Sequence, residues 1–244
     1  MSEFRPCIVV PVYNHGVSAA RLTARLADFD LKIFLIDDGS TLETEAIDGA
    51  AATSMVELVR HKGNQGKGGA VMTGLRAAKI AGFTHAVQID ADGQHAIEDI
   101  SDFLKRAEVE PDAVICGCPI YDASVPLGRR VGRYLTHAWV WIETLSFGIK
   151  DSMCGFRVYP LSSTVPVLDQ AGLGRRMDFD PEILVRLAWK GVPIRSVPTK
   201  VIYPEGGRSN FRLVADNWLI TLMHTRLFFG MLLRFPRLIA QKLS

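Results

Sequence analysis

The chain has 244 residues, with 28 Lys and Arg against 26 Asp and Glu, a formal net charge of +2 and 48% hydrophobic residues. This composition excludes disordered, collagen-like and coiled-coil proteins, and the length is enough for one large α/β domain with a substantial core. The small net charge provides no general attraction for a polyanion, so we expect no nucleic-acid partner.

The first 120 residues alternate short β-branched segments with helical segments, the pattern of a mostly parallel sheet with helices on both faces. Several strands are apolar throughout, as expected when helices cover both faces of the sheet. The predicted strands are 7–12, 32–37, 56–60, 85–90 and 113–117. The predicted helices lie near 18–28, 41–52, 68–81 and 97–107, and Ser40 with Glu43 forms a capping box for the second.

The rest of the chain does not continue this regular alternation of strands and helices. We expect a basic, aromatic-rich helix near 128–147, an extended segment at 155–159, a helix over 181–189 and extended segments at 194–197 and 200–203. From 217 to 233 nearly every residue is apolar, and the polar residues fall on two opposite sides of a helical wheel. This pattern indicates a helix kinked near Gly230 or two short helices.

These observations predict two parts: an α/β domain over 1–210 and a helical segment over 211–244. The apolar side of the C-terminal segment, flanked by arginines, suits a membrane interface, and packing on the core or on a second copy of the chain is the alternative. No window reaches the ~18 apolar residues of a membrane span.

The four cysteines indicate the compartment. They lack the spacing of a metal site, lie in apolar surroundings and suit a reducing environment; they are Cys7, Cys116, Cys118 and Cys154. The N-terminal sequence MSEFRPC does not resemble a signal peptide. We therefore expect a cytoplasmic protein that contacts the inner face of the cell membrane peripherally.

Polar residues follow three of the first four predicted strands, as PVYN at 11–14, DDGS at 37–40 and DADGQH at 90–95. Ligands of open α/β sheets bind beyond the carboxyl ends of the strands. Asp90, Asp92 and Gln94 form a set of hard oxygen ligands that suits Mg²⁺ or Mn²⁺ together with a phosphate. The alternative is that the two aspartates form a turn and cap the helix beginning near Ile97.

A glycine-rich loop, HKGNQGKGGA at 61–70, opens the third predicted helix. Its backbone amides and Lys67 suit the phosphates or ribose of a nucleotide. The spacing matches neither a Walker A loop nor GxGxxG, and a capped turn is the alternative.

In combination, PVYN, DDGS, NQGKGGA and DADGQH resemble the family 2 glycosyltransferases of the GT-A fold, in particular the polyprenyl-phosphate sugar synthases. The resemblance runs from about residue 6 to 211 and includes DSMCGFR at 151–157 and MDFDPEIL at 177–184. It implies a GT-A-like sheet and an inverting, metal-dependent glycosyltransferase. A narrower likeness to bacterial lipid-modifying glycosyltransferases rests on YPEG at 203–206 and HTR at 224–226.

The resemblance also implies site residues. A nucleotide-sugar donor is implied to bind through a set drawn from the strand ends, the glycine-rich loop and the basic helix: Pro11, Tyr13, Asn14, Asp37, Asp38, Asn64, Lys67, Asp90, Arg130 and Arg133. Within this set, Asp37 accepts a hydrogen bond from the base. Asp90, Asp92 and Gln94 are the implied ligands of Mg²⁺ or Mn²⁺.

On the acceptor side, a hydroxyl acceptor requires a general base, for which Asp180 is the first candidate and Asp178 or Glu182 the next, while Arg157 helps to hold phosphates. Asp180 directly precedes Pro181, so a helix N-cap is the structural alternative for it.

The chain departs from the family pattern at two places. His15 replaces an acidic residue, and Pro204 replaces an arginine of the motif R-x-x-G-x-S, with Arg208 as a neighbouring substitute. The second change favours a hydroxyl acceptor over a phosphate.

We therefore expect an inverting glycosyltransferase that moves a sugar from a UDP- or GDP-sugar to a membrane-associated lipid or polyprenyl-phosphate acceptor. A sugar-1-phosphate nucleotidyltransferase and a catalytically degenerate membrane adaptor are the alternatives.

Overall fold

The computed structural model describes residues 3–120, 127–170, 172–201 and 212–243, with only the backbone of 127–131 and 243. Within these residues the strands form one sheet in the order β3-β2-β1-β4-β6-β5-β7. The strands are β1 (Pro6–Val12), β2 (Ile33–Asp37), β3 (Val56–Arg60), β4 (His85–Gln88), β5 (Val114–Ile120), β6 (Arg157–Pro160) and β7 (Ile194–Lys200). The helices are α1 (Gly16–Leu26), α2 (Thr44–Ala50), α3 (Lys67–Ile80), α4 (Ile100–Val109), α5 (Leu127–Thr144), α6 (Leu161–Gln170), α7 (Phe179–Trp189) and α8 (Leu213–Leu243), with short 3-10 turns at Ala27–Phe29 and Ile97–Asp99.

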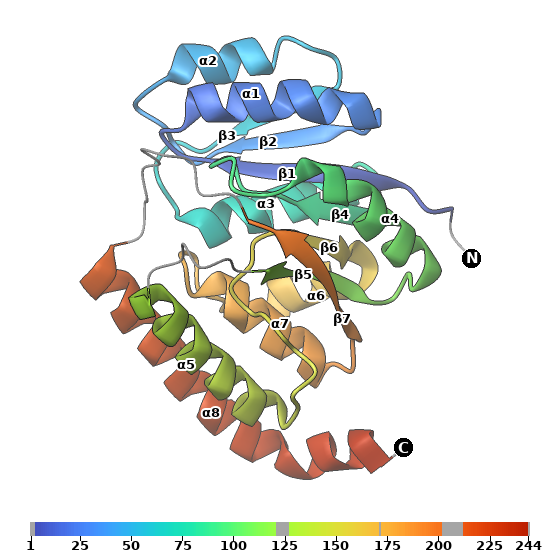
Figure 1. The fold of residues 1–244 in the computed structure, drawn as a ribbon, viewed down its shortest axis with the longest axis vertical. Coiled ribbons are helices and arrows are strands. Elements are labelled where there is room, and N and C mark those ends of the chain that lie inside the picture. The colour runs from blue at the N-terminus through green and yellow to red at the C-terminus, as the bar shows by residue number, and fades with distance from the viewer. Residues whose placement is uncertain (1–2, 121–126, 171, 202–211, 244) are drawn as a thin grey trace.

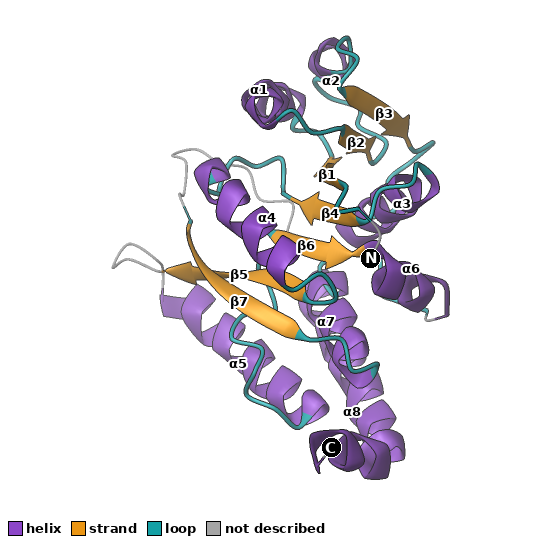
Figure 2. Ribbon diagram, turned by 90° about the vertical axis from the view of Figure 1, so that its right-hand side faces the viewer, coloured by secondary structure: helices purple, strands orange, loops and turns teal. Residues whose placement is uncertain are grey.

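Helices cover both faces of the sheet (Figures 1 and 2). Alternate residues of β1 point into two different cores: Ile8 and Val10 pack with α1, α2 and α4, while Cys7 and Val9 pack with α3, α6 and α7. This alternation follows from the twofold side-chain period of a strand and explains why the strand is apolar throughout. The predicted α/β architecture is confirmed.

The second half of the sheet differs from a simple parallel arrangement. β6 pairs antiparallel with both β4 and β5, so it reverses the direction of the chain in the middle of the sheet. Helix α6 directly follows β6, contains Pro166, and was absent from the sequence prediction. The extended segment predicted at 194–197 continues without a break to Lys200 as one strand, β7, and Val201 forms an isolated bridge with His95, while Ile202 lies outside the described residues. Tyr203 lies outside the described residues.

The capping box predicted for α2 is wrong. Helix α2 begins at Thr44, and Glu43 before it has a left-handed φ of 56°. The Ser40 hydroxyl accepts a hydrogen bond from the Asn14 amide, and the Glu43 carboxylate accepts one from Val17 in the first turn of α1. Both side chains therefore join the β2–α2 loop to the start of α1.

Helix α8 is one element, as in the first of the two predicted alternatives, a single kinked helix, and not two short helices; its ribbon bends toward the C-terminal end, and Pro236 lies inside it. Gly230 does not interrupt it: a Cβ there would lie 2.9 Å from the Trp189 ring, so the glycine permits close packing on α7. Five residues on its inner face, Ile220, Met223, Leu227, Met231 and Leu238, belong to the core beneath the sheet. Among the described helices, none combines the length and hydropathy that crossing a membrane requires.

Candidate active site

The polar strand ends predicted from the sequence lie along one edge of the sheet. β1 runs parallel to both β2 and β4, with Val12 opposite Asp37 and Val9 opposite Gln88. The residues that follow these strands therefore emerge on the same side, where open α/β sheets bind ligands. Asp37 and Asp90 occupy this edge from β2 and from the turn after β4.

The Asp37 carboxylate is fully buried and engaged by protein donors. Its oxygens accept hydrogen bonds from the Ser40 amide at 2.9 Å and from Arg60 Nε at 2.6 Å. Burial acts to raise the pKa of Asp37, but the hydrogen bonds of Ser40 and Arg60 hold this pKa below its ordinary value. Arg60 was missed by the sequence analysis, although it ends β3 directly opposite Asp37.

Asp38 and Asn14 shape the surrounding loops. Asp38 accepts hydrogen bonds at 2.8 Å from the amides of Gln65 and Gly66 and from His61 Nδ1. Asn14, with a left-handed φ of 55°, accepts from the amides of Thr41 and Leu42. These two side chains hold the glycine-rich loop and the β2–α2 loop in place, and contact between them and a nucleotide stays a prediction.

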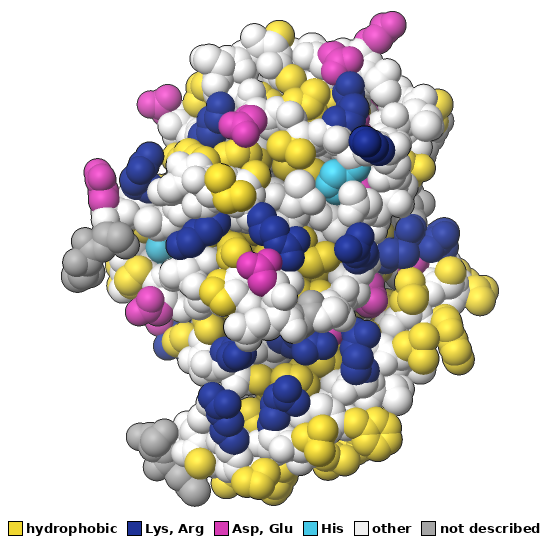
Figure 3. All heavy atoms as spheres, turned by 180° about the vertical axis from the view of Figure 1, so that it is seen from behind, with side chains coloured by type: hydrophobic (Ala, Val, Ile, Leu, Met, Phe, Trp, Pro, Cys, Tyr) yellow, Lys and Arg dark blue, Asp and Glu magenta, His cyan; other side chains and the backbone are white. Residues whose placement is uncertain are grey.

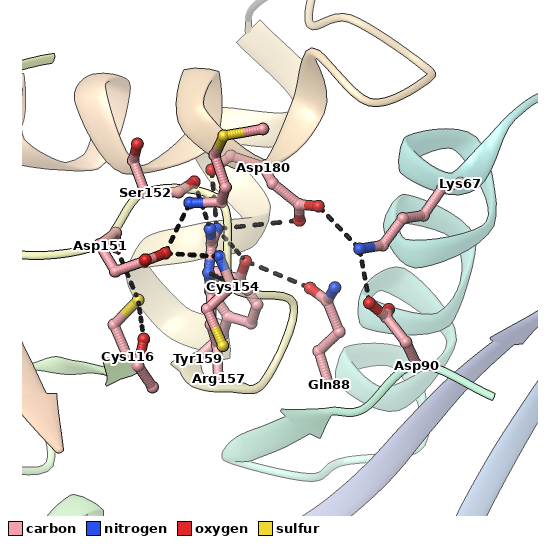
Figure 4. Close-up of polar contacts among 12 residues, drawn as sticks. Lys67, Gln88, Asp90, Cys116, Asp151, Ser152, Cys154, Arg157, Tyr159 and Asp180 are labelled. Atoms are coloured by element: carbon pink, nitrogen blue, oxygen red, sulfur yellow. Dashed lines mark hydrogen bonds and ion pairs between the residues drawn. The ribbon is translucent and has the colours of Figure 1, made fainter. Parts of the chain in front are cut away.

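Lys67, which the sequence analysis assigned to the nucleotide-sugar donor, lies between Asp90 and Asp180 (Figure 4). Its Nζ donates hydrogen bonds of 2.8 Å to Asp90 Oδ2 and to Asp180 Oδ2. The side chains of Lys67 and Asp90 are 18% and 19% exposed, and that of Asp180 only 5%. Lys67 thus joins the carboxylate after β4 to the carboxylate in the first turn of α7.

The ion pairs of Lys67 change the protonation of the groups involved. Burial alone would lower the pKa of the Lys67 ammonium, but Asp180 and Asp90 raise it well above its ordinary value. Burial likewise acts to raise the pKa of Asp90, and the charges of Lys67 and then His95 reverse this, so that the pKa lies well below its usual range. Lys67 and Asp90 are therefore both ionised at neutral pH.

Gly155 makes this arrangement sterically possible. A Cβ at position 155 would overlap Asp90 Oδ2 and lie 2.7 Å from Lys67 Nζ. Any side chain here would thus enter the contact between Lys67 and Asp90. The glycine of the DSMCGFR segment has a direct packing function at the site.

Only some of the carboxylate oxygens near the predicted Mg²⁺ or Mn²⁺ site lack a hydrogen-bond partner in the protein. Asp90 Oδ1 and Asp180 Oδ1 are buried and have no hydrogen-bond partner. Asp92 Oδ1 accepts from the Gln94 amide at 3.0 Å, which forms the turn expected as the alternative, while the helix at Ile97 has no side-chain cap. Burial, followed by the charge of Asp90, raises the pKa of Asp92.

These unpartnered oxygens fit a hard divalent cation, because carboxylate oxygens are the ligands that Mg²⁺ and Mn²⁺ prefer. No preassembled group of three His, Cys, Asp or Glu side chains occurs in the part of the chain that the structure describes. The remaining ligands would therefore come from Asp92, from Gln94, from water or from the substrate.

The side chain of Arg157 lies inside the protein. Its side chain is fully buried and donates to four groups, the carbonyls of Ser152, Cys154 and Asp180 and the hydroxyl of Tyr159. Its NH1 also lies 4.0 Å from Asp180 Oδ1 (Figure 4). The expectation that Arg157 faces a phosphate does not fit this burial; it positions Asp180 and the 151–157 segment.

Arg133 on α5 forms a two-pronged pair with Asp151, with distances of 2.6 and 2.7 Å. The same carboxylate accepts from the amides of Met153 and Cys154. Arg133 therefore anchors this segment to α5. The Arg130 side chain, Pro204 and Arg208 lie outside the described residues.

The N-cap alternative for Asp180 is wrong. The N-cap position of α7 is Asp178, which makes no side-chain cap, and Asp180 turns toward Lys67 instead. Burial raises the pKa of Asp178. Glu182 is fully buried and accepts hydrogen bonds from Gly174, Arg186 and Arg226, so a role as a solvent-facing base does not fit its surroundings.

The glycine-rich loop packs against the segment that precedes α7. The Gly69 amide donates to the Arg175 carbonyl at 3.0 Å, and Arg176 NH1 donates to Asn64 Oδ1 at 3.3 Å. Gly68 has no room for a Cβ beside Phe179. The predicted donor loop and the predicted acceptor segment are thus in direct contact, which the sequence did not indicate.

Pro11, Tyr13 and Gln94 complete the predicted set. Pro11 lies in β1 opposite Ile36, next to the register pair that contains Asp37. Tyr13 and Gln94 are partly exposed at the same edge. Sequence analysis therefore found the edge and most of its polar residues, but it missed Arg60, His61, His95, Arg175 and Arg176.

Comparison with known proteins identifies relatives. Residues 7–163 match the model of the family described as "Glycosyl transferase family 2". A UDP-N-acetylglucosamine–dolichyl-phosphate N-acetylglucosaminyltransferase of Methanococcus voltae is 27% identical over 217 residues, covering 81% of this chain and 86% of the relative. A dolichyl-phosphate beta-glucosyltransferase of Dictyostelium discoideum is 27% identical, covering 82% and 67%. An undecaprenyl-phosphate mannosyltransferase of Micrococcus luteus is 26% identical, covering 84% and 86%.

Among solved structures, TarS 1-349 of S. aureus is similar with a TM-score of 0.55 and 15% identity. The match covers 79% of this chain and 58% of the TarS chain. At this identity the likeness concerns the fold alone, and it agrees with the GT-A-like sheet expected from the sequence motifs.

Proposed function

This chain belongs to glycosyl transferase family 2, and on that premise we propose that it transfers a sugar from a nucleotide diphosphate sugar to a lipid phosphate at a membrane. The arrangement of Lys67 between Asp90 and Asp180, at the edge formed by the strand ends, carries the proposal. The names of the relatives, which are dolichyl-phosphate and undecaprenyl-phosphate sugar transferases, support the acceptor class.

The donor nucleotide would lie over the ends of β1 and β2, where Pro11, Tyr13 and Asp37 are found. The ionised Asp37 would accept a hydrogen bond from a ring N–H of the base. Asp90, Asp92 and Gln94 would hold Mg²⁺ or Mn²⁺, which when bound neutralises the negative charge that builds on the departing diphosphate. The unpartnered Asp90 Oδ1 supports this assignment.

In the transfer itself, an oxygen of the lipid phosphate attacks the anomeric carbon from the face opposite the leaving group. A new carbon–oxygen bond forms, the bond to the diphosphate oxygen breaks, and its electron pair leaves with the nucleoside diphosphate. A phosphate is already ionised at neutral pH and needs no general base. Asp180, whose carboxylate is paired with Lys67, then serves to fix the position and charge of this lysine.

This acceptor differs from the hydroxyl that the replacement at Pro204 favoured. With a hydroxyl acceptor, Asp180 would have to be free to take a proton. Its carboxylate is instead engaged by the hydrogen bond from Lys67 and lies 4.0 Å from Arg157.

A membrane surface would supply the acceptor. Exposed apolar side chains lie along the outer sides of α5 and α8, among them Leu135, Trp218, Phe229 and Leu233, with exposures of 62%, 62%, 60% and 84%. Contiguous exposed apolar residues on one face of a helix are typical of an interfacial helix. All four cysteines are unpaired, which suits a reducing compartment, and we propose the cytoplasmic face of the membrane.

The test is a transfer assay with purified full-length protein and three labelled donors, UDP-glucose, UDP-N-acetylglucosamine and GDP-mannose, with Mn²⁺. Each donor is offered with a polyprenyl phosphate and, as the matched control, with the corresponding polyprenol. We expect product and nucleoside diphosphate only with the phosphate. Equal transfer to the alcohol would assign a hydroxyl acceptor, and release of pyrophosphate from a nucleoside triphosphate and a sugar phosphate would assign a nucleotidyltransferase.

A further inference from the structure

A basic hollow lies on the back of the molecule, between α6, α7 and the C-terminal part of α8 (Figure 3). It has a volume of about 200 Å³. Four cationic side chains line it together with apolar walls: Arg186, Lys190, Arg234, Arg237, Trp189 and Leu238. We call this hollow the α7–α8 pocket.

The cations of the α7–α8 pocket are largely uncompensated. Arg186 pairs with Glu182 at 2.7 Å. Lys190 donates to the neutral side chain of Gln170 and Arg234 to the carbonyl of Gly230. Among the described residues, no carboxylate lies within ion-pair distance of Lys190, Arg234 or Arg237. The pocket therefore attracts an anion.

The walls of the α7–α8 pocket are held in place. The Trp189 indole donates to the Glu143 carbonyl at 2.8 Å, which fixes the ring between α5 and α8. The Arg234 guanidinium lies 4.8 Å from the centre of this ring, in a cation–π contact. An arginine stacked on a fixed ring is preorganised to donate to a phosphate.

The pocket is separate from the proposed transfer site. Asp180 lies in the first turn of α7, and Lys190 lies just beyond its last residue. At 1.5 Å per residue, these ends of the helix are about 15 Å apart. A ligand of the α7–α8 pocket is therefore not the donor bound at the strand ends.

The surroundings of the pocket indicate an amphiphile. On α8, Phe229, Leu233 and Arg237 follow one another at intervals of four residues, so they form one row on the helix surface. The first two are highly exposed apolar side chains, and the third lines the pocket. Figure 3 shows hydrophobic side chains along the lower edge of the molecule, below the basic hollow. The cations thus lie at the margin of the apolar surface.

We propose that the α7–α8 pocket binds the phosphate of an anionic membrane phospholipid while the outer side of α8 lies in the bilayer surface. The proposal rests on the proposed function only in placing the protein at a membrane. Cationic residues beside an apolar helix face are the pattern expected for attraction to an anionic leaflet. The bound headgroup would fix the orientation in which the strand-end site faces the membrane.

The test is flotation of the full-length protein with neutral phosphatidylcholine vesicles and with vesicles containing phosphatidylglycerol. The variant Lys190→Gln/Arg237→Gln removes two pocket charges, and Arg21→Gln/Arg25→Gln removes two charges on α1, at the other end of the molecule (Figure 1). We expect the pocket variant to bind anionic vesicles about thirtyfold more weakly, from ~1 kcal/mol per charge, and to bind neutral vesicles normally. The α1 variant should bind like the wild type.

Four results would overturn the proposal. Normal binding of the pocket variant, or an equal loss in the α1 variant, would show that the pocket is not the anionic site. A thermal shift by glycerol phosphate without vesicles, absent from the pocket variant, would assign the pocket to a free anion. A dimer in sedimentation that dissociates in the pocket variant would assign the pocket to a second copy of the chain.

A separate measurement distinguishes this proposal from the proposed function. Sugar transfer to a short-chain, water-soluble lipid phosphate needs no vesicle, so the pocket variant should retain it. If the wild type did not transfer sugar to this water-soluble lipid phosphate, the proposed function would be contradicted, and the vesicle result would be unaffected.

Discussion

Replacement of Lys67 by Met tests the centre of the site. Met retains much of the length of the side chain but removes the ammonium that donates to Asp90 and Asp180 at 2.8 Å. Two carboxylates then remain close together, one of them 5% exposed, with the buried Arg157 as the nearest compensating charge on the Asp180 side. Among the described residues, Asp90 then keeps His95 as its ion-pair partner, 3.7 Å away.

The expected loss of stability follows from the burial of these charged groups. Removal of one partner from a buried ion pair costs about 3–5 kcal/mol, because the remaining charge is left without compensation. The 18% and 19% exposure of Lys67 and Asp90 and the presence of Arg157 place the loss near the lower end, at ~3 kcal/mol. For a chain of this size each kcal/mol lowers Tm by ~2–4 °C, so we expect a decrease of roughly 6–12 °C at pH 7.

The pH dependence provides a second signature. In the wild type the pKa of Asp90 is lowered by Lys67, so the stability that Asp90 contributes is present above its unfolded value of about 3.9 and is lost as the pH falls through the folded value. Without Lys67, burial raises this pKa. The contribution of Asp90 is then present at low pH and lost as the pH rises. The difference between variant and wild type should therefore be smaller at pH 4 than at pH 7.

The assay is thermal and urea unfolding of both proteins from pH 4 to pH 7, with Lys62→Met as the control. Lys62 lies in the same loop and is exposed, so its replacement removes the same charge and should change stability by less than ~0.5 kcal/mol. If Lys67→Met is as stable as the control at pH 7, or if its deficit is constant with pH, Lys67 does not neutralise the buried carboxylates.

Three further substitutions test other parts of the molecule. Gly155→Ala places a Cβ between Asp90 and Lys67, so calorimetry should show a loss of ~1–3 kcal/mol and the transfer assay a loss of product; wild-type stability would contradict the packing argument. Asp92→Asn should abolish the dependence of nucleotide affinity on Mn²⁺ without unfolding the protein, and titration calorimetry with and without EDTA measures it. Burial raises the pKa of Glu143, so the contribution of Glu143 to stability is present at low pH and lost as the pH rises. The stability of Glu143→Gln, measured relative to the wild type, should therefore be higher at pH 8 than at pH 5. A relative stability that is higher at pH 5 would refute the argument.

The first half of the fold was predictable because its signals are local. β1 is apolar throughout and β2 is apolar up to its last residue, Asp37, since both of their faces are covered, and this pattern is visible without knowledge of the partner strands. The antiparallel insertion of β6 was not predictable, because its four residues carry no information about which neighbours they join. Helix α6 was missed because Pro166 interrupts a segment of mixed polar and β-branched residues that contains few strong helix formers.

The candidate site likewise has a part that the sequence predicted and a part that it did not. The strand-end residues were found because a sheet with parallel neighbours brings such ends together whatever lies between them. The role of Lys67 was not predictable: its contact with Asp180 joins residues 113 positions apart, and no local pattern encodes that distance. The N-cap expected at Asp180 failed because α7 begins at Phe179, which places Asp180 inside the first turn, where its carboxylate pairs with Lys67.

The charges of the site explain why a divalent cation and the donor are expected to bind together. The carboxyl groups of Asp90, Asp92 and Asp180 lie at the site, and the cations beside Asp90 and Asp180 are Lys67 and Arg157. A diphosphate sugar brings about two more negative charges to a partly buried site, where repulsion is poorly screened. A divalent cation on the unpartnered Asp90 Oδ1 leaves the hydrogen bonds of Lys67 to the other oxygens intact. Under the proposed function, the buried lysine and the added cation would act on different oxygens of the same carboxylate, and together they would offset the negative charge of the entering diphosphate.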